Sequence, residues 1–202
     1  MGISRMNHAV LYVRDARRQQ RFYADVLGFA TVIEHPDGGF VFMRGPDSPN
    51  HHDIAFFTIG ADAQPSDAGR RTVGMYHIAW EVGSLDELAE MRERLTAAGA
   101  LVGASDHGAN KSLYARDPDG LEFEVMWLVP PEHWGEAEHQ AIIEPLDIDA
   151  ETELELIEGL RVLGRATALC SEISLDTDPA EPWFFPMNTR ARLIGGPNPD
   201  GE

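Results

Sequence analysis

The chain has 202 residues, which is enough for one ordinary domain with an extension or for two very small domains. Hydrophobic residues make up 43% of it and charged residues 25%, as in globular proteins. Its formal net charge of −18 leaves little positive surface to neutralise phosphates, so nucleic acid is excluded as an expected partner.

The lengths of the apolar runs bear on where the protein is located. The sequence has no apolar run of about eighteen residues, so no membrane-spanning helix and no membrane partner are expected. The first residues lack the apolar core of a signal peptide, which favours a cytoplasmic location. Cys170 is the single cysteine, so no intrachain disulfide supports the fold.

An internal repeat organises most of the chain. The segments MNHAVLYV, at residues 6–13, and MYHIAWEV, at residues 75–82, align without gaps. Both are rich in β-branched, aromatic and other apolar residues, which predicts a strand in each copy.

The first copy continues with a helix and three strands. Residues 15–27 predict a helix that ends at Gly28, because apolar side chains recur there at helical spacing. Those side chains are Phe22, Tyr23, Val26 and Leu27. Strand-like stretches separated by Pro, Asp and Gly turns follow at residues 30–34, 39–44 and 52–59.

The second copy repeats this order. Residues 84–98 predict a helix ending at Gly99, with an apolar face made of Leu85, Leu88, Met91 and Leu95. Three further strands are expected at residues 100–104, 111–116 and 121–127.

The fold class that follows is α+β, with two βαβββ modules. Neither module has enough elements to enclose a core alone, so we expect the two to pair about a pseudo-twofold axis. They would form one curved mixed sheet around a central site, with the helices outside. Residues 1–132 make up this domain, with modules at about 4–60 and 72–130, and residues 133–202 form a C-terminal extension.

The extension is expected to be partly helical and partly irregular. Asp149 is placed to cap a helix over residues 150–169, whose apolar face must be covered. A partner subunit is the preferred cover, which predicts a homodimer or a higher homo-oligomer. The alternative is the open side of the site, walled by the aromatic cluster at residues 183–185.

Two histidines occupy the same position in the two repeat copies. His8 and His77 would face one another across the pseudo-twofold axis, and an internal pair of imidazoles is most simply explained by a shared metal ion. A third ligand is expected on the last strand of the second module, where Glu122 and Glu124 project to one side. Spacing alone does not choose between these two glutamates.

From His8 to Trp127 the chain resembles the vicinal-oxygen-chelate superfamily, and within it the catechol 2,3-dioxygenases. The family's last strand has Asp-Pro-Asp-Gly, three residues, and then a ligand Glu. Here that pattern runs from Asp117 and selects Glu124. The resemblance implies His8, His77 and Glu124 as a facial triad with open positions, which suits Fe(II), with Mn(II) or another divalent metal as the alternative.

Three further residues resemble those of ring-cleaving extradiol enzymes. His52 stands in a His-Asp-Ile-Ala motif, and its neighbour His51 is expected to point to the opposite face of the same strand. His107 and Tyr114 match the histidine and tyrosine that such enzymes place around the substrate. The gap between them is two residues shorter than in the longer two-domain enzymes.

The resemblance implies an extradiol-type dioxygenase that cleaves a small aromatic diol with O2. His52 would be the acid/base, while His107 and Tyr114 would bond the substrate oxygens. One alternative is a metal-dependent glyoxalase, isomerase or thiol transferase of the same superfamily, which would need a fourth ligand near the end of the first module. A non-enzymatic alternative is a drug-binding resistance protein, which would not retain the metal triad.

Overall fold

The computed structural model describes residues 2–69 and 71–152. These residues fall into two compact units. One comprises the chain up to Val102 together with Leu113–Met126, and the other comprises Gly103–Ser112 together with the described residues from Trp127 on.

The elements follow the predicted βαβββ order twice. The first module contains β1 (Ala9–Val13), α1 (Ala16–Asp25), β2 (Ala30–Glu34), β3 (Phe40–Arg44) and β4 (Ile54–Thr58). The second contains β5 (His77–Val82), α2 (Leu85–Ala97), β6 (Leu101–Asp106), β7 (Asn110–Arg116) and β8 (Glu122–Leu128). Two short 3-10 helices, Pro131–His133 and Gly135–Glu138, come after them.

Each module forms its own four-stranded sheet. The first has the order β1-β4-β3-β2, with β1 parallel to β4 and the other neighbours antiparallel. The second has the equivalent order β5-β8-β7-β6. The α+β class and both modules are confirmed, and hydrogen bonding defines two sheets where a single continuous sheet was expected. The repeated strands β1 and β5 are therefore equivalent edge strands.

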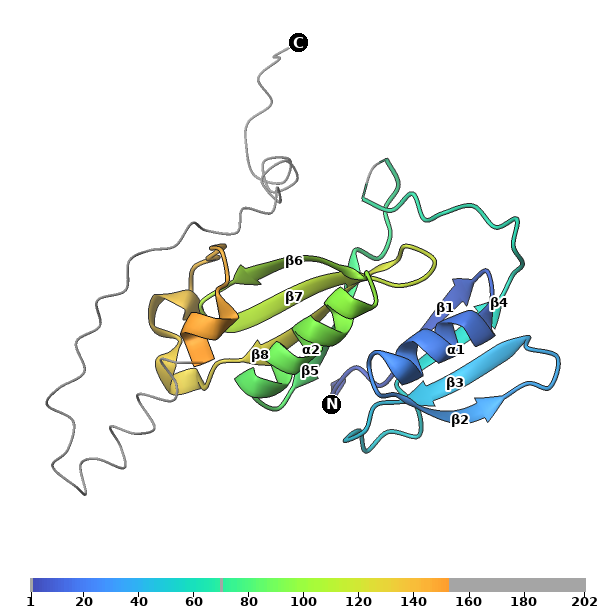
Figure 1. Cartoon of the computed structure of the whole chain (residues 1–202), viewed down its shortest axis with the longest axis horizontal. Coiled ribbons are helices and arrows are strands. Elements are labelled where there is room, and N and C mark those ends of the chain that lie inside the picture. Colours follow the sequence, from blue (N-terminus) through green and yellow to red (C-terminus); the bar gives the residue numbers. More distant parts are fainter. Residues whose placement is uncertain (1, 70, 153–202) are drawn as a thin grey trace, which may run out of the picture. The chain divides into compact units, whose positions relative to one another are not determined.

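Helix α1 lies across the first sheet (Figure 1) and buries a face that is partly polar. Asp15 caps it, accepting hydrogen bonds from the backbone N–H groups of Arg17 and Arg18. Tyr23 is 2% exposed and packs edge-on against Phe56 of β4, with ring centroids 4.9 Å apart. Gln19 is also buried, which hydrophobic periodicity did not predict.

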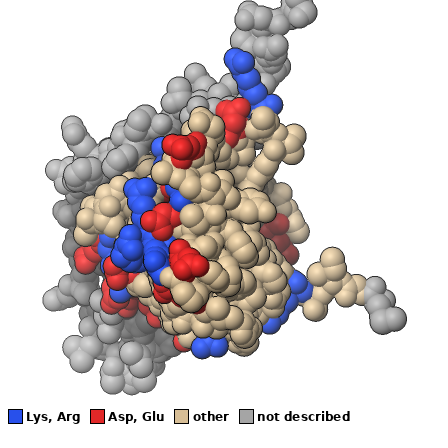
Figure 2. Space-filling model, turned by 90° about the vertical axis from the view of Figure 1, so that its right-hand side faces the viewer, with Lys and Arg blue, Asp and Glu red and all other residues tan. Residues whose placement is uncertain are grey.

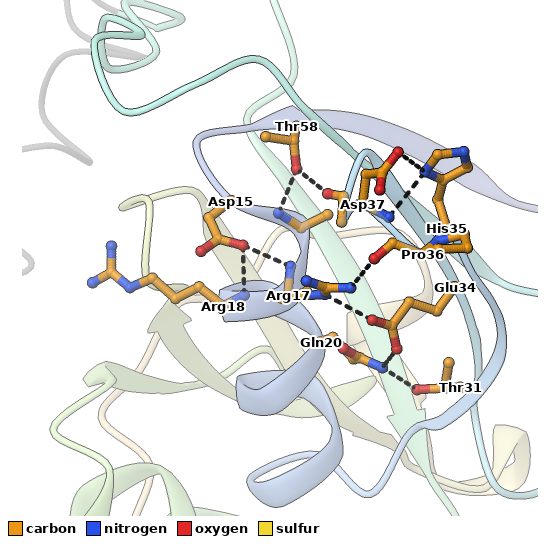
Figure 3. A network of polar contacts seen from close by, with 12 residues as sticks. Asp15, Arg17, Arg18, Gln20, Thr31, Glu34, His35, Pro36, Asp37 and Thr58 are labelled. Carbon is orange, nitrogen blue, oxygen red and sulfur yellow. Dashed lines mark hydrogen bonds and ion pairs between the residues drawn. The ribbon is translucent and has the colours of Figure 1, made fainter.

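A polar network fixes the start of α1 to the hairpin of β2 and β3 (Figure 3). Arg17 Nε donates to Glu34 Oε1 over 2.8 Å, and this bond lowers the pKa of the exposed Glu34 carboxyl. The hydroxyl of Thr58 accepts from the backbone N–H of Ala16 and donates to the carbonyl of Gly38. The helix is thus held against its own module at its first turn.

Helix α2 has the apolar face that the spacing predicted. Its buried residues are Leu85, Leu88, Met91 and Leu95. Ser84 caps it, its hydroxyl accepting from the backbone N–H of Glu87.

The turn before β8 ties the second module to the first. Asp119 accepts hydrogen bonds from the backbone N–H of Arg14 at 2.7 Å and from its guanidinium at 3.3 Å. Aromatic rings pack nearby, with Tyr23 6.4 Å from Trp80 and Phe22 6.0 Å from Phe123 between centroids. The strand that carries both candidate glutamates therefore begins at a point anchored to α1.

The described part of the C-terminal extension packs on the turn between β6 and β7. Glu144 and Asp106 exchange two backbone hydrogen bonds of 2.8 and 2.9 Å. Lys111 Nζ forms ion pairs with the carboxylates of Asp106 and Glu151. The described part of the extension therefore contacts residues 106 and 111 of its own chain.

The predicted cap Asp149 is wrong. Helical backbone starts at residue 148, and Asp147 accepts from the backbone N–H of Ala150. Asp147 is the right distance before the first free N–H groups, whereas Asp149 already lies in the first turn. The rest of the helix expected over residues 150–169, and the aromatic cluster, lie outside the described residues.

Charged side chains of both signs lie close together on the face shown in Figure 2, and much of the surface around them is uncharged. Some charged side chains of opposite sign form ion pairs, such as Arg17 with Glu34 and Arg14 with Asp119. Among the described helices, none is long and apolar enough to cross a membrane.

Asp117, in the turn before β8, provides a prediction about stability. Burial is the main cause that raises the pKa of its carboxyl from 3.8 to about 6, while hydrogen bonds from the backbone N–H groups of Leu121 and Asp119 oppose the rise. The protonated form therefore favours folding fully below pH 3.8, and this contribution is lost as the pH rises through about 6.

Asp117→Asn should therefore unfold at higher urea than the wild type at neutral pH, because the amide keeps the acceptor Oδ1 without the buried charge. The advantage should be on the order of 3 kcal/mol. It should shrink as the pH falls from about 7 toward 4. A difference between the two proteins that is constant over this range would contradict the prediction.

Candidate metal centre

The second sheet brings a histidine and a buried carboxylate into contact. His77 begins edge strand β5, and Glu124 lies on its neighbour β8. The Nε2 atom of His77 lies 3.0 Å from Oε2 of Glu124, and Glu124 is only 7% exposed. Two ligands bound to one metal at about 2.1 Å and at a right angle are separated by about 3 Å. The spacing of this pair therefore fits two neighbouring metal ligands.

Glu122 has a different partner. It lies two residues before Glu124 on β8, and Oε2 of its carboxylate is 3.8 Å from Nη2 of Arg116 on β7. Spacing alone left the choice of glutamate open and the resemblance selected Glu124, and the structure places Glu124 against His77 and Glu122 against an arginine. A carboxylate already paired with an arginine has less need of a metal ion.

Tyr114 lies beside the same histidine. It is on β7, it is 7% exposed, and its ring centroid is 6.0 Å from that of His77 in an edge-on arrangement. The structure thus brings together three of the residues that the sequence singled out in the second module.

In the first module, His8 and His52 are in contact. Their ring centroids are 4.4 Å apart, and the edge of Phe42 packs against His52 at 4.9 Å. His8 immediately precedes β1 and is exposed, whereas His52 lies two residues before β4 and is half-buried. Both side chains project from irregular segments at the start of neighbouring strands.

The expectation for His51 is wrong. It was placed on the face opposite His52, but Nδ1 of His51 lies 3.0 Å from Nδ1 of His52. The alternation of a strand does not apply here, because β4 starts only at Ile54 and the two histidines occupy a bend.

The surroundings of His52 favour its neutral form. Burial is the main cause that lowers the pKa of this imidazole, and the neighbouring His8 and His51 lower it further, whereas Asp53 opposes them. Its Nε2 atom is buried and has no hydrogen-bond partner among the described residues. A neutral imidazole has one nitrogen that carries a hydrogen and one that can accept.

The complete triad is not gathered in one place. Within residues 2–69 and 71–152, no group of three or more His, Cys, Asp and Glu side chains is arranged to hold a metal ion. His77 and Glu124 form one pair, and His8 lies with His52. The Nδ1 atom of His77 is buried without a hydrogen-bond partner in the described structure, although metal-bound histidines usually donate from that atom.

His107 belongs to the other compact unit. It lies in the turn between β6 and β7, where its Nδ1 is 2.8 Å from the carbonyl oxygen of Ile142. A carbonyl oxygen only accepts, so Nδ1 of His107 carries the hydrogen. The extension therefore determines how this ring is held.

Sequence reasoning missed Asn7 and Asn50. Asn7 Oδ1 lies 2.8 Å from Nδ1 of His8, and Asn50 is buried next to Asn7. The available signal was their position directly before His8 and His51, but an isolated Asn is common in turns and drew no attention.

Comparison with known proteins agrees with the resemblance. The model of the Glyoxalase/Bleomycin resistance protein/Dioxygenase superfamily matches residues 5–125. Biphenyl-2,3-diol 1,2-dioxygenase 3 of Rhodococcus globerulus is 30% identical over 131 residues, covering 63% of this chain and 66% of that protein. Metapyrocatechase 2 of Cupriavidus necator is 27% identical over 120 residues, covering 57% of this chain and 34% of that protein.

A solved structure shows the same fold. A glyoxylase/bleomycin resistance protein/dioxygenase domain from Frankia sp. EAN1pec superposes with a TM-score of 0.52 and 23% identity, covering 67% of this chain and 97% of that domain. The match of the family model to more than half of the chain, together with the paired βαβββ modules, leads to one conclusion. The chain belongs to the Glyoxalase/Bleomycin resistance protein/Dioxygenase superfamily.

Proposed function

We propose that this protein is an Fe(II)-dependent extradiol dioxygenase that cleaves a catechol-like ring with O2. The observation that carries the proposal is the contact between His77 and the buried carboxylate of Glu124. His8 would complete the ligand set from the equivalent edge strand of the first module. The similarity to a biphenyl-2,3-diol 1,2-dioxygenase and to a metapyrocatechase supports this reaction class, and the chain spans 66% and 34% of their lengths.

The donor set fits the proposed metal. Two imidazoles and one carboxylate form the facial triad of non-haem Fe(II) oxygenases, and Mn(II) or another divalent ion is the alternative. When bound, such an ion supplies Lewis acidity and open positions for the two vicinal oxygens of a diol and for O2.

The protein residues would then move and hold protons. The buried Nε2 of His52 would accept a proton from the diol and return it as the ring opens. The phenol of Tyr114, which lies beside His77, would hydrogen-bond a substrate oxygen. The resemblance alone assigns His107 a similar role, and its Nδ1 atom is engaged by the carbonyl of Ile142.

One observation disfavours the glyoxalase-type alternative. That chemistry would use a fourth ligand near the end of the first module, where Asp53 is the available carboxylate. Its Oδ2 accepts from the backbone N–H of Gly45, and its Oδ1 accepts from Ser48 and Asn50. A carboxylate engaged by three donors is poorly placed to bind a metal. The buried pair of His77 and Glu124 likewise disfavours the metal-free, drug-binding alternative.

The reaction itself is tested by loading the protein with Fe(II) without oxygen, adding catechol, and then admitting air. The proposal expects a yellow ring-opened product that depends on both iron and protein. Zn(II)-loaded protein is the control, since zinc has no redox chemistry. Consumption of a glyoxalase substrate instead, with no oxygen uptake from catechol, would contradict the proposal.

The ligand assignment predicts different results for the two glutamates of β8. Glu124→Ala should lose most of the bound iron, because it removes the carboxylate that faces His77. Glu122→Ala is the matched control on the same strand and should retain iron, since its carboxylate pairs with Arg116. Iron content after anaerobic loading and gel filtration measures both. The reverse result would show that the ligand is Glu122.

The acid/base assignment predicts that His52→Asn binds iron normally but turns over slowly. The rate of ring opening should fall by roughly 10² to 10⁴, the usual contribution of a positioned acid or base. Stopped-flow absorbance and iron content measure the two effects separately. Loss of iron from this variant would instead make His52 a ligand.

A further inference from the structure

His8 and His52 both lie outside the strands of the first module. His8 comes before β1 and His52 comes before β4, so each depends on the segment that leads into its strand. A buried asparagine, Asn50, lies between these two segments and is 9% exposed. Its contacts therefore bear on both histidines.

Every polar atom of the Asn50 side chain is engaged. Its Nδ2 donates to Oδ1 of Asp53 over 2.7 Å and to the backbone carbonyl of Asn7 over 2.9 Å. Its Oδ1 accepts from Nη2 of Arg5 over 2.5 Å and from Nδ2 of Asn7 over 3.1 Å. The asparagine thus joins the segment before β1 to the loop before β4.

The chemistry of the partners fixes which way each amide faces. A carboxylate only accepts and a guanidinium only donates, so Nδ2 of Asn50 must face Asp53 and Oδ1 must face Arg5. Asn7 must then present its Nδ2 to Asn50. The Oδ1 atom of Asn7 is left facing Nδ1 of His8, 2.8 Å away. An amide oxygen only accepts, so Nδ1 of His8 carries the hydrogen.

We propose that Asn50 and Asn7 are positioning residues that hold His8 with its hydrogen on Nδ1 and its Nε2 lone pair available to a metal. The tautomer follows from the hydrogen bonds alone, whereas its use in metal binding rests on the proposed function. Metal-bound histidines almost always donate their second N–H to such an acceptor.

The tautomer can be read without any metal. Full-length, metal-free protein labelled with 15N-histidine gives long-range 1H–15N correlations that distinguish the two ring nitrogens, at about pH 8, where an ordinary imidazole is neutral. The signal of His8 is assigned by its absence in His8→Gln. The wild type should show hydrogen on Nδ1, and Asn7→Ala should shift His8 toward the Nε2–H form that free histidine favours.

Two further variants separate positioning from general damage. Asn7→Asp retains an acceptor for Nδ1 and should keep the wild-type tautomer. Ser48→Ala removes a donor to Asp53 and an acceptor for the backbone N–H of Asn50. It leaves the side-chain path from Asn50 through Asn7 to His8, so it should also keep the wild-type tautomer. Asn50→Ala frees the amide of Asn7 to rotate and should give a mixture of tautomers.

A metal-binding measurement then connects the tautomer to the site. Competition with a chelator should show that Asn7→Ala binds Fe(II) about 10- to 100-fold more weakly than the wild type, with Ser48→Ala unchanged. Hydrogen on Nε2 of His8 in the wild type would overturn the inference. If the tautomer and affinity results hold but iron-loaded protein does not cleave catechols, the positioning stands and the proposed reaction fails.

Discussion

The contact between the buried carboxylate of Glu124 and the imidazole of His77 is the interaction on which the proposed site depends. An ionised carboxylate in such a position costs several kcal/mol unless a cation or hydrogen-bond donors compensate. Glu124 lies on β8, between the strands that carry His77 and Tyr114, and the imidazole of His77 is 3.0 Å away. An N–H of this imidazole can donate a hydrogen bond to the carboxylate, and the proposed metal ion would bridge the two groups when bound. The rest of the proposed site is arranged around this requirement.

The two modules position their candidate histidine ligands in different ways. The equivalent strand orders place His8 and His77 at the start of the two edge strands β1 and β5, as the repeat predicted. His77 is the first residue of β5 and is aligned by the sheet, whereas His8 is outside β1 and is aligned by Asn7 and Asn50. Asp119, bonded to Arg14, couples the strand of Glu124 to the first module. The position of His77 is thus set by a strand, whereas the position of His8 is set by side-chain hydrogen bonds.

Much of the fold follows from periodicity. The apolar face of α2 and strand β2 appear where the spacing places them, because local propensity and burial agree there. Gln19 shows the limit of predicting burial from periodicity. It is a polar residue on α1 that is buried in the folded protein, and the spacing of apolar residues does not predict this. The site was harder to predict from periodicity, because the choice of Glu124 needed the family pattern. The bend at His51 and the network of Asn50 depend on loop geometry that no periodicity encodes.

The most direct test of the metal centre is a crystal structure of the protein loaded with Fe(II) without oxygen, with anomalous diffraction recorded at the iron edge. We expect one iron position bound by Nε2 of His8, Nε2 of His77 and the carboxylate of Glu124, at about 2.0–2.2 Å. Iron bound without Glu124, or held by Asp53 or Glu122 instead, would contradict it.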